Sequence, residues 1–129
     1  MKTFLRICAA LAAAAALFAG GYAAAQNTFG TPKSVLHVVT IKWKEDSSEA
    51  DRQKALDGVR EMARQIPGIK NIWLKATRVQ PREYHAVFAV EFADRAAAEN
   101  YAEHPVREAW TKIYLPIREA SSSVQITNE

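Results

Sequence analysis

Residues 84–110 read YHAVFAVEFADRAAAENYAEHPVREAW, and this stretch decides the fold. Residues 84–92 alternate aromatic and β-branched side chains and are apolar on both sides apart from their ends. This pattern predicts a central strand that is covered on both faces. Asp94 then precedes an alanine-rich segment that ends near Glu103, which predicts a short capped helix. A second helix is expected to begin at Pro105, because proline suits the first helical position.

The preceding residues predict two strands and one long helix. Residues 35–44 alternate strongly, with His37, Val39 and Ile41 on one side, which predicts a strand. Residues 48–66 have a capping-box start at Ser48 and apolar residues at helical spacing, so an amphipathic helix is expected to rest on the core. The opposite side of this helix is charged and includes Arg52 and Arg60. Residues 69–79 predict a second strand.

The C-terminal part predicts the buried side of the last helix and a final strand. Four apolar residues form the expected buried stripe of that helix: Val106, Ala109, Trp110 and Ile113. Residues 115–116, Leu-Pro, are expected to end it. Residues 122–127 predict a final short strand, with Val124 and Ile126 pointing inward.

The resulting element order is β-α-β-β-α-β, which indicates an α+β, ferredoxin-like sheet with its helices on one face. The second face would show Val38, Thr40, Val87 and Ala89, which is too apolar to remain in water. Two copies that pack sheet against sheet would bury it. The sequence therefore predicts a homodimer that closes into a dimeric α+β barrel.

The N-terminal segment has the layout of a secretory signal peptide. A basic start with Lys2 and Arg6 is followed by an apolar run and by Ala23–Ala25, so residues 1–25 are expected to be cut off before Gln26. The alternative is an uncleaved membrane anchor, although the run is shorter than the roughly 20 residues that a spanning helix needs. We expect a flexible leader at 26–33, a domain at 34–129, a periplasmic or secreted location, and no membrane attachment after cleavage.

Composition limits the chemistry of the mature chain. The only cysteine of the full sequence, Cys8, leaves with the signal peptide. Neither a disulfide nor a thiol nucleophile is therefore expected in the mature chain. The signal also carries two of the seventeen basic residues and none of the fourteen acidic ones, which leaves a net charge of +1. Without a basic stripe, nucleic acid is excluded as an expected partner.

Several short motifs together resemble those of one family. They are Leu-His-Val-Val at 36–39, Ile-Pro-Gly at 66–68, Glu-Phe at 91–92 and Tyr-x-x-His-Pro at 101–105. Their order and spacing resemble the stress-responsive A/B barrel family, and the likeness covers nearly all of residues 35–129. The resemblance implies a dimeric α+β barrel.

The resemblance also implies candidate site residues. The best understood enzyme of the family is a plant cyclase, which works without metal or cofactor and uses a histidine base and a tyrosine. Tyr101 and His37 match the tyrosine and another histidine of that enzyme, but the base falls at Arg107. A guanidinium stays protonated, so Arg107 cannot be that base. It could bind an anionic ligand, or it could simply pair with Glu103 or solvent.

We therefore take His37, Tyr101, Arg107 and Trp110 as candidate ligand-binding residues, and Tyr101 and His37 as the only catalytic candidates. For Trp110 the alternative is a core position. His104 is expected to shape the corner before Pro105. No metal site is expected, because His85 and Glu91 lie about 20 Å apart at opposite ends of one strand.

Three functions fit these observations. The first is an exported homodimer that binds a small apolar or amphipathic molecule without catalysis and without a cofactor. The alternative is a cofactor-independent cyclase, isomerase or lyase that acts on a carbonyl compound through Tyr101 with His37 or Arg107. A third, a cofactor-independent monooxygenase or haem-handling protein, rests on analogy between folds alone.

Overall fold

The structure is a computed structural model that describes residues 1, 6, 12 and 29–129 of the chain. The predicted signal peptide, apart from those three isolated positions, and the first part of the predicted leader lie outside the described residues. Residues Pro32–Glu129 form one compact unit, distinct from Met1–Thr31, and the fold below is that of the former. Among the helices that the structure describes, none is long and apolar enough to cross a membrane.

One antiparallel sheet of four strands forms the frame of the domain, in the order β2-β3-β1-β4. The strands are β1 (Val35–Trp43), β2 (Ile69–Trp73), β3 (Ala86–Phe92) and β4 (Arg118–Ile126). The two central strands, β1 and β3, pair along their whole shared length, from Val35 opposite Phe92 to Ile41 opposite Ala86. The central position predicted for the third strand is therefore confirmed. The helices cover only one of its faces, so the predicted cover on the other face stays a prediction.

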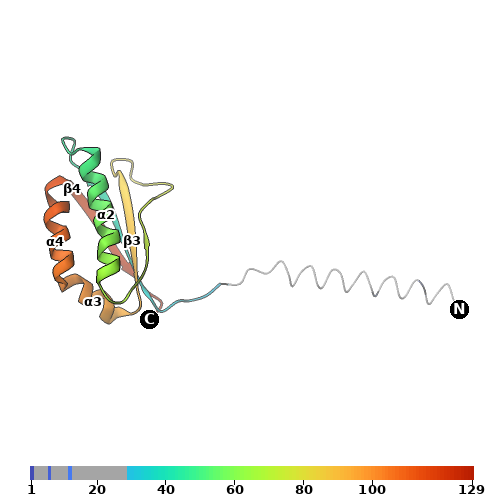
Figure 1. The fold of residues 1–129 in the computed structure, drawn as a ribbon. Helices are drawn as coiled ribbons and strands as arrows, with labels where there is room; N and C mark the ends of the chain where they lie inside the picture. The colour runs from blue at the N-terminus through green and yellow to red at the C-terminus, as the bar shows by residue number, and fades with distance from the viewer. Residues whose placement is uncertain (2–5, 7–11, 13–28) are drawn as a thin grey trace. The chain divides into compact units, whose positions relative to one another are not determined.

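The helices lie on one face of the sheet, as Figure 1 shows. They are α2 (Glu49–Gln65), α3 (Arg95–Glu103) and α4 (Pro105–Tyr114), and a 3₁₀ turn, η1 (Leu115–Ile117), follows α4. The element order and the single helical layer confirm the predicted ferredoxin-like α+β fold.

The helices α2, α3 and α4 each begin at a side-chain cap, and the sequence indicates two of these caps, Ser48 and Asp94. Ser48 Oγ accepts a hydrogen bond from the backbone N–H of Asp51 at 3.1 Å. The side chain of Asp94 accepts one from the first turn of α3 at 2.8 Å. His104 Nδ1 accepts one from the backbone N–H of Val106 at 3.2 Å. His104 thus fixes the corner between α3 and α4, which is the structural role predicted for it.

The core lies between the helices and the sheet face that carries Val39 and Ile41. Its largest fully buried side chains are Phe88, Phe92, Ile41, Met62, Val59 and Val90. Trp110 of α4 packs closely on α2 and donates from Nε1 to the backbone oxygen of Ala55 at 2.8 Å. An added Cβ at Gly58 would lie 2.4 Å from Cδ1 of Trp110, so this close approach depends on a glycine at 58.

The opposite face of the sheet, here called the open face, carries no helix in the part of the chain that the structure describes. Strand pairing places Val38 opposite Ala89 and Val124, and Trp73 opposite Ala89. Trp73 is 49% exposed, and Val124 and Ile126 are each 53% exposed. The apolar side chains of the open face are Leu36, Val38, Trp73, Val87, Ala89, Val124 and Ile126.

The predicted bounds of three strands are wrong. β2 ends at Trp73 rather than at residue 79, because the polar, proline-containing residues 74–85 leave the sheet as a loop. β3 begins at Ala86, two residues later than predicted. β4 begins at Arg118 rather than at 122, because β1 extends far enough for Trp43 to pair with Arg118.

The predicted orientation of the last strand is also wrong. Val124 and Ile126 do not point inward, because Gln125, which lies between them, pairs opposite His37 on the helix-covered side. Period-two alternation then puts both apolar side chains on the open face.

The buried stripe of α4 differs from the predicted one as well. Ala109 and Ile113 are exposed, whereas Trp110 and Tyr114 are buried. Two aromatic side chains four residues apart share one side of a helix and are much larger than alanine, so they set which side turns to the core.

Candidate functional site

Three of the four predicted site residues come together between the sheet and the helices. The ring centroids of His37 on β1 and Tyr101 on α3 lie 6.1 Å apart. The guanidinium carbon of Arg107, in the first turn of α4, lies 5.4 Å from the centroid of the Tyr101 ring. Arg107 Nη1 donates to the backbone oxygen of Ala102 at 3.1 Å. Arg107 therefore covers Tyr101, and it forms no ion pair with any residue that the structure describes.

Burial decides the protonation states in this cluster. Burial raises the pKa of Tyr101 above its usual 10.0, although the charge of Arg107 acts in the opposite direction. Burial lowers the pKa of His37 below its usual 6.5, and the charge of Arg107 lowers it further. At neutral pH the cluster holds a neutral imidazole, a protonated phenol and a permanent cation. Such a set can accept one proton and stabilise one negative charge.

The tyrosine of this cluster is nevertheless buried. Tyr101 is only 3% exposed, and neither of the two cavities described below is lined by His37, Tyr101 or Arg107. Nδ1 of His37 and Nε of Arg107 are buried without a hydrogen-bond partner among the described residues. The side chains are therefore suited to chemistry, but neither of these two cavities reaches them.

Trp110, the fourth predicted site residue, lies in the core instead. Its ring stacks on Tyr114 at 4.5 Å between centroids and meets Phe88 edge to face at 5.8 Å. With its N–H bonded to the backbone of α2, Trp110 has no polar group left for a ligand. Trp110 therefore occupies a core position, which is the alternative given for it in the sequence analysis.

A cavity of about 670 Å³ lies between α2 and residues 74–87, and we call it the α2 cavity. Its buried or half-buried apolar lining is formed by Trp43, Leu56, Leu74, Ala76, Val79, Ala86 and Val87. Exposed or half-exposed polar side chains complete it: Glu49, Arg52, Gln53, Arg60, Lys75 and His85. Small-molecule sites are commonly about 300–1,000 Å³ and combine apolar walls with a few polar groups. The α2 cavity has a volume in this range, and its lining is about half polar.

Sequence reasoning missed this cavity for two reasons. The sequence places the charged side of α2 opposite the core, although Arg52, Leu56 and Arg60 recur every four residues and so share one helix face. It predicts a strand over residues 74–79, whereas in the structure these residues form a loop that lines the other side of the cavity. The position of Leu56 between Arg52 and Arg60 on one helix face is the feature of the sequence that could have indicated this cavity.

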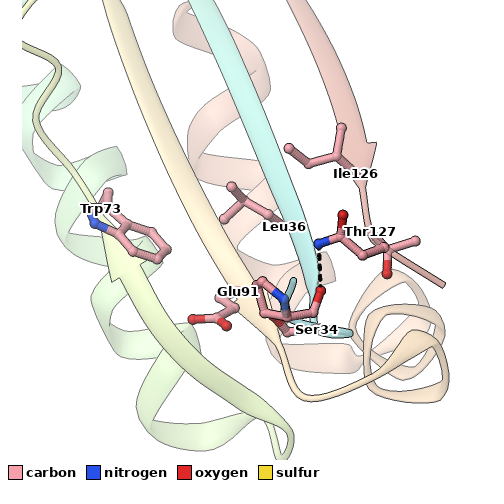
Figure 2. A pocket seen from close by; sticks show the side chains of 8 residues that line it. Ser34, Leu36, Trp73, Glu91, Ile126 and Thr127 are labelled. Atoms are coloured by element: carbon pink, nitrogen blue, oxygen red, sulfur yellow. Dashed lines mark hydrogen bonds between the residues drawn. The ribbon is translucent and has the colours of Figure 1, made fainter. Parts of the chain in front are cut away.

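A second cavity, of about 290 Å³, opens on the open face, where Leu36, Trp73, Glu91 and Ile126 meet (Figure 2). Hydrogen bonds from Asn71 and Ser34 hold the pKa of Glu91 below its usual 4.5. The Nδ2 of Asn71 lies 2.5 Å from Oε2 of Glu91. Because this hollow sits in an apolar sheet face, a second copy packed on that face would cover it.

One ring nitrogen of His85 bonds to the backbone. Its Nδ1 accepts a hydrogen bond from the backbone N–H of Trp43 at 3.1 Å, which joins the start of β3 to the end of β1. Within the described residues, no group of three or more His, Cys, Asp or Glu side chains is placed to hold a metal ion.

Comparison with known proteins supports the fold and the family. The family model described as Stress responsive A/B Barrel Domain matches residues 35–128. This match confirms the resemblance inferred from the motifs. A comparison with curated proteins finds no match.

Solved structures with the same fold include proteins of different kinds. A dimeric protein of unknown function with a ferredoxin-like fold from Bacteroides fragilis is 20% identical, with a TM-score of 0.61 over 76% of this chain and 99% of its own. A hydroxynitrile lyase from Passiflora edulis is 16% identical, with a TM-score of 0.66 over 76% and 95%. A cofactor-independent oxygenase from Streptomyces nogalater is 13% identical, with a TM-score of 0.61 over 75% and 94%. At these identities the likeness shows the fold alone.

Proposed function

For this chain, which belongs to the stress-responsive A/B barrel family, we propose that it is an exported homodimer that binds a small apolar or amphipathic molecule without catalysis. The observation that carries the proposal is the α2 cavity. Its lining combines seven apolar with six polar side chains, and its volume of about 670 Å³ suits a small amphipathic molecule.

Dimerisation is supported by the open face and by related structures. Its seven apolar side chains come from all four strands and include three large side chains that are about half exposed, Trp73, Val124 and Ile126. Contiguous apolar surface of this kind usually marks an interface. The B. fragilis protein with this fold is described as dimeric. A two-fold contact of sheet on sheet would bury the open face of both copies.

Export rests on the sequence of the first 25 residues. A basic start, an apolar run and an Ala-x-Ala site occur there in the order that a secretory signal peptide requires. We therefore place the mature domain in the periplasm or outside the cell.

The absence of catalysis is inferred from the His37–Tyr101–Arg107 cluster. The position that holds the base in the family's plant cyclase is a permanently charged arginine here. That arginine covers the buried tyrosine, and neither cavity described above reaches either residue.

The enzyme alternative is favoured by one observation, namely that the same cluster gathers a neutral imidazole, a phenol and a guanidinium. Two proteins of this fold are a lyase and an oxygenase. If opening of the cluster admits a carbonyl compound, both Tyr101→Phe and His37→Asn should abolish its turnover. Ligand binding in the α2 cavity should survive both changes.

Native mass spectrometry of the protein isolated from the cell envelope of its own host tests the main proposal. We expect a mass of two chains, each beginning at Gln26, with a retained small molecule. Leu56→Trp and Ala76→Trp should each narrow the α2 cavity at its apolar lining and reduce or remove that added mass. Ile113→Trp, which places the same side chain on the exposed side of α4, should retain it. Retention by both cavity variants would refute the proposed site.

A further inference from the structure

The charge of the α2 cavity is unevenly distributed. Three cationic side chains line it, Arg52, Arg60 and Lys75, against one carboxylate, that of Glu49. Arg52, Arg60 and Glu49 all come from α2, and Lys75 lies across the cavity on the loop that follows β2. The lining therefore has an excess of two positive charges beside an apolar wall, in a chain whose mature part is nearly neutral.

Two of the three cationic side chains, Arg52 and Lys75, have no carboxylate partner among the described residues. Arg52 donates to two neutral oxygens, from Nε to Ser47 Oγ at 2.8 Å and from Nη2 to the backbone oxygen of Lys44 at 3.1 Å. Lys75 forms no ion pair within the part of the chain that the structure describes.

Arg60 is the one cation of the three with an acidic partner. It pairs with Asp57 at 2.6 Å, but both side chains are about half exposed, at 47% and 49%. Exposed pairs one helical turn apart contribute little free energy, so an incoming anion can replace Asp57 at small cost.

From this arrangement we propose that the ligand of the α2 cavity is an amphipathic anion, a molecule with an apolar chain and a carboxylate or similar group. The proposal rests on the proposed function and names the ligand class of the same site. The apolar chain of the ligand lies against Leu56, Leu74 and Val79. Its anionic group lies at the rim of the cavity, between Arg60 and Lys75. Arginine and lysine are the side chains that recognise carboxylates and phosphates in proteins.

Three probes of equal chain length and different charge test this inference: decanoate, decanol and decylamine. Isothermal titration calorimetry at low and at high salt measures their affinities. The protein used is the form that the host produces after any signal-peptide cleavage. We expect decanoate to bind about tenfold more tightly than decanol, with decylamine weakest, because charge complementarity at a partly exposed rim contributes on this scale. The preference should shrink as salt screens the rim.

Variants locate the charge that makes the difference. In Arg60→Gln/Lys75→Gln, decanoate should lose its advantage over decanol while decanol binds as before. Arg64→Gln/Lys112→Gln removes the same charge from exposed helix positions outside the cavity and should keep the full preference. Circular dichroism confirms that each variant is folded.

The possible outcomes separate the two proposals. Equal binding of decanoate and decanol to the wild-type protein would overturn the anion inference and leave the binding function standing. A preference for decanoate that persists in Arg60→Gln/Lys75→Gln would also overturn it, because the anion would then be held elsewhere. If none of the three probes binds, the proposed function itself fails.

Discussion

The guanidinium of Arg107 lies over the ring of Tyr101, with its carbon 5.4 Å from the ring centroid. This contact joins the first turn of α4 to the buried side of α3. We expect Arg107 to stabilise the fold through this contact. The contribution of this contact to stability can be measured by replacing Arg107.

Replacing Arg107 with alanine should lower the free energy of unfolding by about 0.5–2 kcal/mol, the range of partly buried cation–π contacts. Arg107→Lys should recover only part of this, because an ammonium lacks the flat guanidinium that packs on the ring. Urea unfolding of the three proteins measures the effect. An alanine variant as stable as the wild type would mean that Arg107 is merely a solvent-facing helix residue.

A negative charge at position 87 should dissociate the dimer. Val87 lies on the open face beside the central pairing of β3 with β1, and burying an unpaired carboxylate in an interface costs several kcal/mol. Analytical ultracentrifugation of Val87→Asp should show monomer or aggregate.

Ala109→Asp is the matched control, since Ala109 is exposed on α4, on the other side of the sheet. It should sediment as the wild type does. Wild-type protein that is monomeric at micromolar concentration would contradict the dimer proposal.

The packing of α4 on α2 should be sensitive to one methyl group. A Cβ at position 58 would come within 2.4 Å of Trp110, so Gly58→Ala must push α4 away. Overpacking of this kind costs about 1–3 kcal/mol. Gly30→Ala, where no atom lies within 4 Å, should change stability by no more than about 0.5 kcal/mol. Thermal unfolding of both variants compares them, and equal melting temperatures would show that the helices have room to adjust.

Stability should fall as the pH drops below 6.5, partly because of His37. Its pKa is lowered in the folded protein by burial and by Arg107, so the unfolded chain binds the extra proton first. The contribution is fully present above pH 6.5 and is lost as the pH falls toward the folded-state pKa.

His37→Asn should reduce the loss of stability between pH 7 and pH 5, as measured by urea unfolding at both values. If wild type and variant lose the same amount, His37 is hydrated in the folded state, contrary to its position beside Tyr101.

The sequence predicted the fold well because its signals were local. Caps at Ser48 and Asp94, a proline at 105 and strict alternation on β1 each specify an element without reference to the rest of the chain. The bounds of β2 and β4 were missed because they depend on pairing, and β4 is extended by the length of β1 rather than by its own serine-rich sequence.

The candidate site was only partly predictable. The family resemblance selected His37, Tyr101 and Arg107, and the structure places these three side chains close together. Whether a pocket opens beside them depends on side-chain packing, which the sequence does not report. The α2 cavity depends on the conformation of the loop formed by residues 74–85. The sequence does not specify that conformation, so only the structure reveals the cavity.

The most direct test of the binding proposal is an amide NMR titration of the folded protein with decanoate, which reports where the molecule binds. We expect the chemical-shift changes to concentrate at residues 49–60 and 74–87, around Leu56, Ala76 and Val79, with little change at Tyr101 or Arg107. Changes concentrated at His37, Tyr101 and Arg107 would contradict this account, because they would place the ligand at that cluster rather than in the α2 cavity.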